Sequence, residues 1–307
     1  MDSAPARSTT TMNAVPSLSK AALWMIGWLS AMVVIAVAGR EAAKDIAVFQ
    51  IIELRSLIGL ALFYPLVRSA GGLAAMRTAR PWQHIARNTV HYAAQFGWFV
   101  ALTLIPLAQV VAIEFTMPIW TALLAAFFLG ERLTAWKSLA VALGLVGVTI
   151  IVRPVTGELN PGQMIALATA VGFAVSVILV KSLTRTDSVV AIIFWMLVVQ
   201  SVLGLVPAVL VWQWPSWIAW CWIVVVAFCG TFSHYCMARA MLHADATIVV
   251  PMDFLRVPLT AAAGWTIYAE RVDVFTVLGA ALILFGNLLN LRAARGTRAR
   301  AAPIAPR

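Results

Sequence analysis

The sequence predicts an all-α integral membrane protein with ten transmembrane helices, built as two inverted five-helix repeats. Three observations support this fold class: the composition, a series of long apolar stretches and an internal repeat. The 307 residues are 62% hydrophobic and 11% charged, whereas a soluble domain carries about a quarter charged residues. A chain with so few charges cannot cover its surface against water, so a soluble enzyme is excluded.

Ten apolar stretches reach the roughly 20 residues that a helix needs to cross the hydrocarbon core of a bilayer. They cover residues 21–39, 46–66, 84–104, 107–129, 134–152, 161–181, 189–211, 217–241, 246–268 and 272–291. Residues 1–20 form a polar tail without the pattern of a signal peptide, and residues 293–307 form a basic tail. Both tails are expected in the cytoplasm.

Lysine and arginine set the orientation, because cytoplasmic loops accumulate them. With the N-terminus inside, the inner segments hold 16 of the 22 basic residues. The outer segments hold Arg40, Lys44, Arg153 and Arg271. Both termini are therefore expected inside, and the net charge of +10 needs no nucleic-acid partner.

The chain contains an internal repeat at a shift of 139 residues. Between 101–153 and 240–292, 14 of 53 aligned positions are identical, and Glu131-Arg132 aligns with Glu270-Arg271. The repeat divides the chain into residues 21–154 and 155–292. Five helices per unit is an odd number, so the second unit crosses the membrane in the opposite sense. Such inverted repeats favour transport by alternating access.

The segment Pro118–Leu133 (PIWTALLAAFFLGERL), followed by a glycine-containing helix ending near Arg153, resembles the paired EamA-type repeats of the drug/metabolite transporter superfamily. The second copy runs from Pro258 to Gly286 and has Ala269 where the first has Gly130. The resemblance covers residues 21–292. It implies a basket of ten helices around a cavity lined mainly by the first, third, fourth, sixth, eighth and ninth spans.

Ionisable groups inside spans are site candidates, because burying them in hydrocarbon is costly. Two corresponding stripes arise at helical spacing, one on the fourth span and one on the ninth. They comprise Glu114, Pro118 and Thr121, and Asp253, Arg256 and Thr260. Pro118, Pro258 and Pro251 are expected to break their helices.

The two acids, Glu114 and Asp253, are expected on opposite sides of the membrane midplane, facing the transport pathway. One hypothesis is that they bind a substrate cation or a coupling proton in alternation. The alternative is structural: Asp253 pairs with Arg256, and the other carboxylate bonds to a neighbouring helix.

Further polar and aromatic candidates lie on the second, third and eighth spans. A pathway role is expected for His91, Tyr92, Gln95 and Trp98, and for His234 and Tyr235. Glu53 and Arg55 are two residues apart, about 200° around a helix, so they cannot pair with each other. Arg55 is interpreted as an interhelical anchor, with substrate contact as the alternative.

The helix-end motif, Glu131-Arg132 and Glu270-Arg271, is expected to tether each loop to the next helix, where Thr134 and Asp273 are expected N-caps. The small residues Ala140, Gly144, Gly147, Gly279 and Gly286 indicate close helix packing, either internal or between the copies of a homodimer. The sequence is therefore compatible with either a monomer or a homodimer.

The sequence lacks a phosphate-binding loop and metal-ligand spacing, so no metal, cofactor or ATP-driven transport is expected. We expect a secondary transporter of a small metabolite in the bacterial inner membrane, with protons as a candidate coupling ion. The segment Pro251–Pro258 (PMDFLRVP) resembles the bacterial branch that includes riboflavin and S-adenosylmethionine carriers. The aromatic residues favour uptake of a riboflavin-like metabolite. The main alternative is export of amino acids or their derivatives, and a more distant alternative is an intramembrane enzyme or a membrane scaffold.

Overall fold

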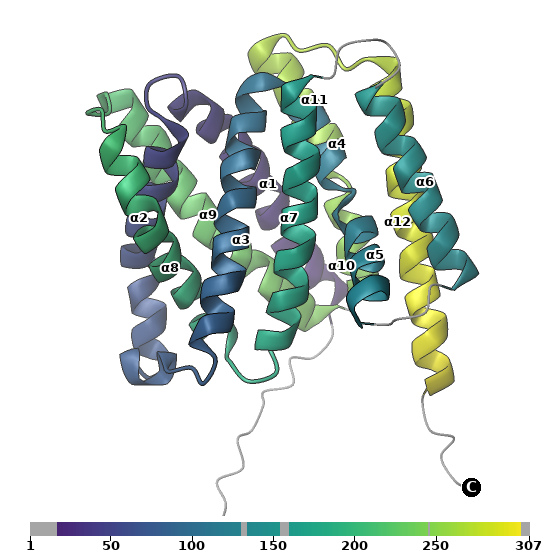
Figure 1. Ribbon diagram of the computed structural model, residues 1–307, viewed down its shortest axis with the longest axis horizontal. Coiled ribbons are helices and arrows are strands. Elements are labelled where there is room, and N and C mark those ends of the chain that lie inside the picture. The colour runs from purple at the N-terminus through teal and green to yellow at the C-terminus, as the bar shows by residue number, and fades with distance from the viewer. Residues whose placement is uncertain (1–16, 130–133, 154–159, 245, 302–307) are drawn as a thin grey trace, which may run out of the picture.

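The computed structural model describes residues 17–129, 134–153, 160–244 and 246–301, and these residues form only helices and their connections (Figure 1). The elements are α1 (Leu18–Ala42), α2 (Val48–Ser69), the short 3₁₀ helix η1 (Leu73–Met76), α3 (Pro81–Leu104), α4 (Leu107–Glu114), α5 (Met117–Leu129), α6 (Ala135–Val152), α7 (Pro161–Leu183), α8 (Val189–Leu210), α9 (Trp217–His243), α10 (Ala246–Asp253), α11 (Arg256–Tyr268) and α12 (Val274–Ala301).

Each predicted span corresponds to one helix or to one pair of half-helices, α4–α5 and α10–α11. Within the described part of the chain, nine of these ten segments are long and apolar enough to cross a membrane. The tenth is α3, whose first half carries the buried polar residues His84, Arg87 and Asn88. The described helices therefore agree with the predicted all-α membrane fold.

Side-chain caps and prolines fix where several helices begin. Hydroxyl groups of Ser17, Thr134, Ser188 and Ser216 accept a backbone N–H of the first turn, and Asn160 does so with its side-chain oxygen. These groups replace hydrogen bonds that a helix start otherwise lacks. The predicted N-cap roles of Thr134 and Asp273 are confirmed, since the Asp273 carboxylate accepts the N–H groups of Phe275 and Thr276.

The fourth and ninth spans are each interrupted near their middle. The first break lies at Phe115 and Thr116, just before Pro118, and the second at Phe254 and Leu255, just before Pro258. A proline removes a backbone donor and its ring crowds the preceding turn, which accounts for both positions. Pro251 lies inside α10 without interrupting it, so the expected second break in the ninth span is wrong.

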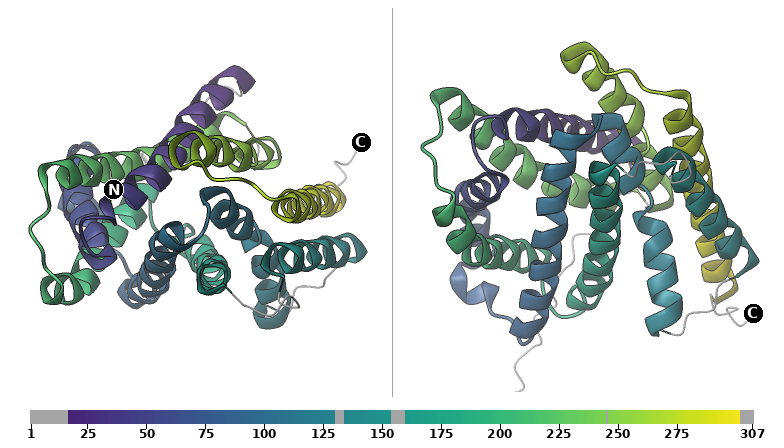
Figure 2. Two further views of the ribbon diagram at one scale, coloured as in Figure 1. Left: turned by 90° about the horizontal axis from the view of Figure 1, so that it is seen from above. Right: turned by 45° about the horizontal axis from the view of Figure 1, so that its top comes forward.

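The two repeats interlock so that helices of one pack against helices of the other. The main pairs are α1 with α9, α3 with α7, α2 with α8 and α6 with α12, and α4 packs against α11 (Figures 1 and 2). The first helices of the repeats, α1 and α7, run through the bundle in opposite directions (Figure 1). The largest cluster of buried apolar residues joins elements of both repeats, among them α1, α3, α4, α9 and α12. Neither repeat therefore buries its apolar surface alone.

The contact between α6 and α12 depends on glycine. A Cβ atom at Gly147 would lie 2.6 Å from the carbonyl oxygen of Gly279, and one at Gly286 would lie 2.8 Å from that of Ala140. Close approach of two backbones requires small residues. The predicted close packing is confirmed, and these glycines form an internal contact.

Polar contacts join helices at both ends of the bundle. At one end, the Glu270 carboxylate pairs with Arg40 of α1 and accepts the Leu107 N–H of α4 at 3.0 Å. At the other, Asp187 accepts hydrogen bonds from Thr78 and the His84 ring, both at 2.9 Å. Glu270 thus ties its loop to α1 and α4, and the expected tether to the next helix is wrong. Arg271 is exposed, and Glu131 and Arg132 lie outside the described residues.

Candidate functional site

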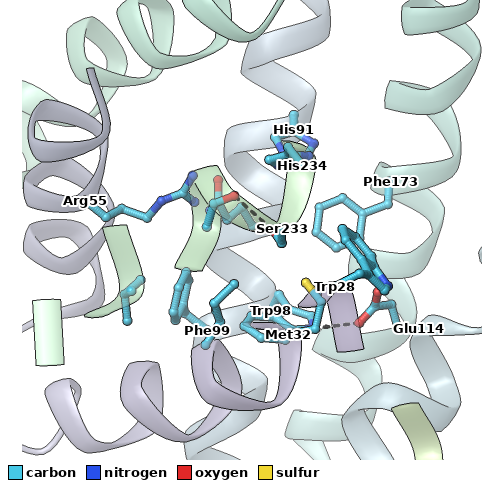
Figure 3. Close-up of a pocket in the computed structure, with 14 residues that line it drawn as sticks. Trp28, Met32, Arg55, His91, Trp98, Phe99, Glu114, Phe173, Ser233 and His234 are labelled. Atoms are coloured by element: carbon cyan, nitrogen blue, oxygen red, sulfur yellow. Dashed lines mark hydrogen bonds between the residues drawn. The ribbon is translucent and has the colours of Figure 1, made fainter. Parts of the chain in front are cut away.

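A cavity of about 120 Å³ lies inside the bundle, between the two repeats. Its lining comes from α1, α2, α3 and α4 of the first repeat and from α7 and α9 of the second. The lining residues are Trp28, Met32, Ile35, Arg55, His91, Gln95, Trp98, Phe99, Glu114, Phe173, Val226, Gly230, Ser233 and His234 (Figure 3). The resemblance implied a lining from the ninth span, but neither α10 nor α11 contributes to it, whereas the second span contributes Arg55.

Aromatic side chains form one part of the cavity wall, where Trp28, Trp98 and Phe173 surround the space near Glu114, with Phe99 farther away on the side of Arg55 (Figure 3). The Trp98 indole N–H donates to a Glu114 oxygen at 2.8 Å, and the Trp28 indole N–H donates to an Asp253 oxygen at 2.6 Å. A buried indole needs such an acceptor. Both rings are therefore fixed in place, with their remaining surface available to a ligand.

The two acids of the predicted stripes meet at one guanidinium. Arg256 donates to Glu114 at 2.8 Å and to Asp253 at 3.4 Å, and all three side chains are largely buried. Glu114 ends α4, Asp253 ends α10 and Arg256 begins α11, so the triad lies where the broken helices meet. The two carboxylates share one cation there, which brings them close together.

Repeat symmetry is visible at the same place. Phe115 and Phe254, which align at the shift of 139, contact each other edge to face with ring centroids 5.3 Å apart. The Arg256 guanidinium lies 4.8 Å from the centre of the Phe115 ring. The structural alternative for the acids therefore agrees with the contacts, because Glu114 and Asp253 already have partners.

The opposite part of the cavity is polar and basic. Arg55 reaches in from α2 towards Ser233 and His234 of α9, with His91 of α3 nearby (Figure 3). The His91 ring lies within hydrogen-bond distance of Ser176, at 3.3 Å. Arg55 is 6% exposed, and among the described residues its guanidinium has no hydrogen-bond or ion-pair partner. The expected interhelical anchor is therefore not seen in this structure.

Several predicted pathway residues lie away from the cavity. Tyr235 is 39% exposed and packs edge to face on Trp24. Thr121 lies on α5, beyond the helix break, and its hydroxyl donates to the Met117 carbonyl. Thr260 is buried and donates to backbone carbonyls of α11. The structure therefore places none of these three in the lining.

Tyr92 and Glu53 face a different interface. Both approach Gly204 of α8, where a Cβ atom would lie 2.5 Å from a Glu53 oxygen and 3.2 Å from the Tyr92 hydroxyl. The predicted pathway role of Tyr92 is not supported, since α3 turns this side chain away from the cavity. Glu53 forms no ion pair among the described residues, so the predicted intramembrane ion pair is not seen for it.

Sequence reasoning missed Trp28, Met32, Phe173 and Ser233, all of which line the cavity. Trp28 alone had a usable signal, because an indole N–H in the middle of an apolar span needs a buried acceptor. The other three resemble ordinary packing residues of a membrane helix. Within the described residues, no group of three potential metal ligands occurs.

Comparison with known proteins gives the family. The model of the EamA-like transporter family matches residues 19–153 and again residues 160–292. The chain belongs to the EamA-like transporter family. Its two matching units coincide with the two interlocked halves described above.

Named relatives in this family are bacterial transporters of different compounds. The chain is 31% identical to a riboflavin transporter of Rhizobium johnstonii, over 72% of this chain and 74% of the relative. It is 27% identical to an S-adenosylmethionine uptake transporter of Rickettsia prowazekii, over 71% and 74%. It is also 27% identical to a pseudopaline exporter of Pseudomonas aeruginosa, over 84% and 90%. These relatives are transporters, not enzymes.

A solved crystal structure shares the fold. It is 20% identical in sequence, covers 92% of this chain and 99% of its own, and superimposes with a TM-score of 0.63. This similarity concerns the fold alone. The family match and the named relatives show that the chain is a multi-pass membrane protein of the EamA-like family that transports a small metabolite.

Proposed function

We propose that the chain is a secondary transporter that moves a small organic metabolite across the bacterial cytoplasmic membrane by alternating access. The observation that carries this proposal is the position of the cavity between the two repeats, beside the breaks of both discontinuous spans. Substrate sites of inverted-repeat transporters lie at such places. Both termini are proposed to face the cytoplasm.

The size of the cavity supports a closed conformation. About 120 Å³ is well below the roughly 300–1,000 Å³ of sites for drug-sized ligands, so a metabolite of that size requires the helices to separate. Glu270 links α1 and α4 at one end of the bundle, and Asp187 joins the start of α3 to the α7–α8 loop at the other. Opening one end at a time would give alternating access.

The aromatic wall supports a substrate with a planar ring, because Trp28, Trp98 and Phe173 offer flat apolar surface. Riboflavin-like uptake is one candidate, and the riboflavin transporters of Rhizobium johnstonii and Brucella anthropi are 31% and 29% identical to this chain. Export of amino-acid-derived compounds is the other. Proton coupling through Glu114 would require that carboxylate to release Arg256 and Trp98.

Counterflow in liposomes tests the proposal. Purified protein is reconstituted in vesicles preloaded with unlabelled riboflavin, S-adenosylmethionine or an amino-acid mixture, and entry of the labelled compound is followed. We expect one class to exchange and to be recovered chemically unchanged. Trp98→Ala should abolish exchange, whereas Trp82→Ala, which changes a tryptophan that is 80% exposed, should not. Absence of exchange for all three classes, or recovery of an altered compound, would contradict the proposal.

A further inference from the structure

We propose that the Arg55 end of the cavity is a binding subsite for the carboxylate of the transported metabolite. The inference rests on the proposed function, since it names the chemical class of substrate for the same cavity. Its geometric basis is Arg55, a residue that is only 6% exposed and that reaches into the cavity from α2 (Figure 3).

A buried charge without a partner is costly, so proteins normally pair it. Among the other buried arginines of the described bundle, Arg87 donates to the Asn88 side-chain oxygen at 2.6 Å, and Arg256 follows this rule with two carboxylates. Arg55 does not. Among the described residues of the cavity lining, the only acid is Glu114, which is already bonded to Arg256 and Trp98. A bound ligand that carries a negative charge would pair with Arg55 and remove this cost. The position of Arg55 therefore favours a role in binding an anionic group.

The nearest acid in the sequence, Glu53, does not neutralise Arg55. It lies two residues away and therefore on another side of α2, where it approaches Gly204 and Tyr92. Both Glu53 oxygens lack a hydrogen-bond partner among the described residues. Glu53 and Arg55 therefore do not pair with each other, and of the two only Arg55 lines the cavity.

The groups around Arg55 suit a carboxylate. A guanidinium offers parallel N–H donors that match the two oxygens of a carboxylate. His91 and His234 add ring nitrogens at the same end of the cavity, and lysine is absent from the described lining (Figure 3). The Ser233 hydroxyl already donates to the Gly230 carbonyl at 2.9 Å. One fixed cation matches a single negative charge, whereas a phosphate dianion would be left partly uncompensated in hydrocarbon. This favours a carboxylate over a phosphate.

The proposed subsite distinguishes between the two candidate substrate classes, riboflavin-like compounds and amino-acid-derived compounds. Riboflavin carries no ionised group at neutral pH and would leave the Arg55 charge unpaired. An amino-acid-type compound places its carboxylate on Arg55 and its ring or side chain against Trp28 and Phe173. The geometry therefore points to a metabolite that has a carboxylate as well as an apolar or planar part.

Binding of benzoate and of its uncharged isostere benzamide tests the inference. Both probes consist of one ring and one small polar group, and they differ in charge but little in shape. Quenching of tryptophan fluorescence reports binding, because Trp28 and Trp98 line the site. We expect benzoate to bind at least about tenfold more tightly than benzamide, as for a charge-assisted hydrogen bond.

Three variants complete the test. Arg55→Gln should remove the preference for benzoate, and Arg55→Lys should keep part of it. Arg68→Gln, which removes the same charge from an exposed position of α2, should leave the preference unchanged. Without ligand, Arg55→Gln should unfold at the same temperature as the wild type or a higher one, because an unpaired buried charge has been removed.

Four outcomes would overturn the inference: equal binding of benzamide and benzoate, binding of neither, an unchanged preference in Arg55→Gln, or a lower unfolding temperature of unliganded Arg55→Gln. The last would identify Arg55 as a structural anchor. These four outcomes do not depend on the counterflow assay. In that assay, exchange of riboflavin alone would also refute the carboxylate subsite, and it would leave the proposed transport function intact.

Discussion

Replacing Arg256 by methionine should destabilise the protein strongly, because two carboxylates depend on this one guanidinium. Arg256 is 4% exposed and donates to Glu114 at 2.8 Å and to Asp253 at 3.4 Å. Methionine has a comparable length and fills the site without a charge. The change therefore leaves both acids buried beside each other without a cation.

The expected loss is about 3–5 kcal/mol of unfolding free energy, the range for removing one partner of a buried pair. The side chains of Glu114 and Asp253 are each 13% exposed, so solvent screens them little. Glu114→Gln should cost less, about 1.5–3 kcal/mol, because Asp253 still pairs with Arg256. The triple change Arg256→Met, Glu114→Gln and Asp253→Asn should recover most of the loss, since no unpaired charge then remains.

Reversible unfolding in mixed micelles with increasing dodecyl sulfate measures these differences through tryptophan fluorescence. The ranking is the critical result: Arg256→Met least stable, Glu114→Gln intermediate, and the triple variant near the wild type. A loss below about 1 kcal/mol for Arg256→Met, compared with the 3–5 kcal/mol of a broken buried pair, would refute the reasoning. A triple variant as unstable as Arg256→Met would refute it as well.

Three further predictions concern other parts of the molecule. Gly147→Leu should separate α6 from α12 and prevent stable folding, whereas Gly230→Ala, whose Cβ meets nothing closer than 3.8 Å, should fold normally in size-exclusion chromatography. Asp273→Ala should cost about 0.5–2 kcal/mol through loss of the α12 N-cap, and Asp273→Asn much less; a similar loss for both would contradict the capping role. In intact cells without native cysteines, an impermeant maleimide should label Lys44→Cys and not Arg77→Cys, and the reverse pattern would contradict the predicted orientation.

The helix breaks show how far local sequence reasoning reaches. Pro118 and Pro258 each predict an interruption, and both half-helix pairs separate just before them. The effect of a proline on its own helix is local, so no tertiary information is needed. Pro251 shows the limit, since α10 continues through it, and a missing hydrogen bond in one turn was not enough to end the helix.

The candidate site was predicted only in part, because helical spacing is local whereas the orientation of a helix in the bundle is not. Helical spacing places His91, Gln95 and Trp98 on one face of α3, and all three line the cavity. Tyr92 and Tyr235 are neighbours of such residues in the chain, yet they face other interfaces. Which side of a membrane helix faces a cavity depends on its neighbours, because lipid and protein interior are both apolar.

The sequence by itself determined the membrane-spanning class, the number of spans and the duplicated unit, since these depend on hydrophobic length and on matches along one chain. Only the tertiary structure decided that Arg256 forms ion pairs with both acids and that Arg55 is left unpaired beside the cavity. Pairing of charges is a contact between distant segments, such as residues 114 and 256, and it follows from how the two repeats interlock. The physical reason is that the free-energy cost of burying a charged side chain depends on the residue type, which the sequence gives. Whether a partner of opposite charge offsets that cost depends on the fold.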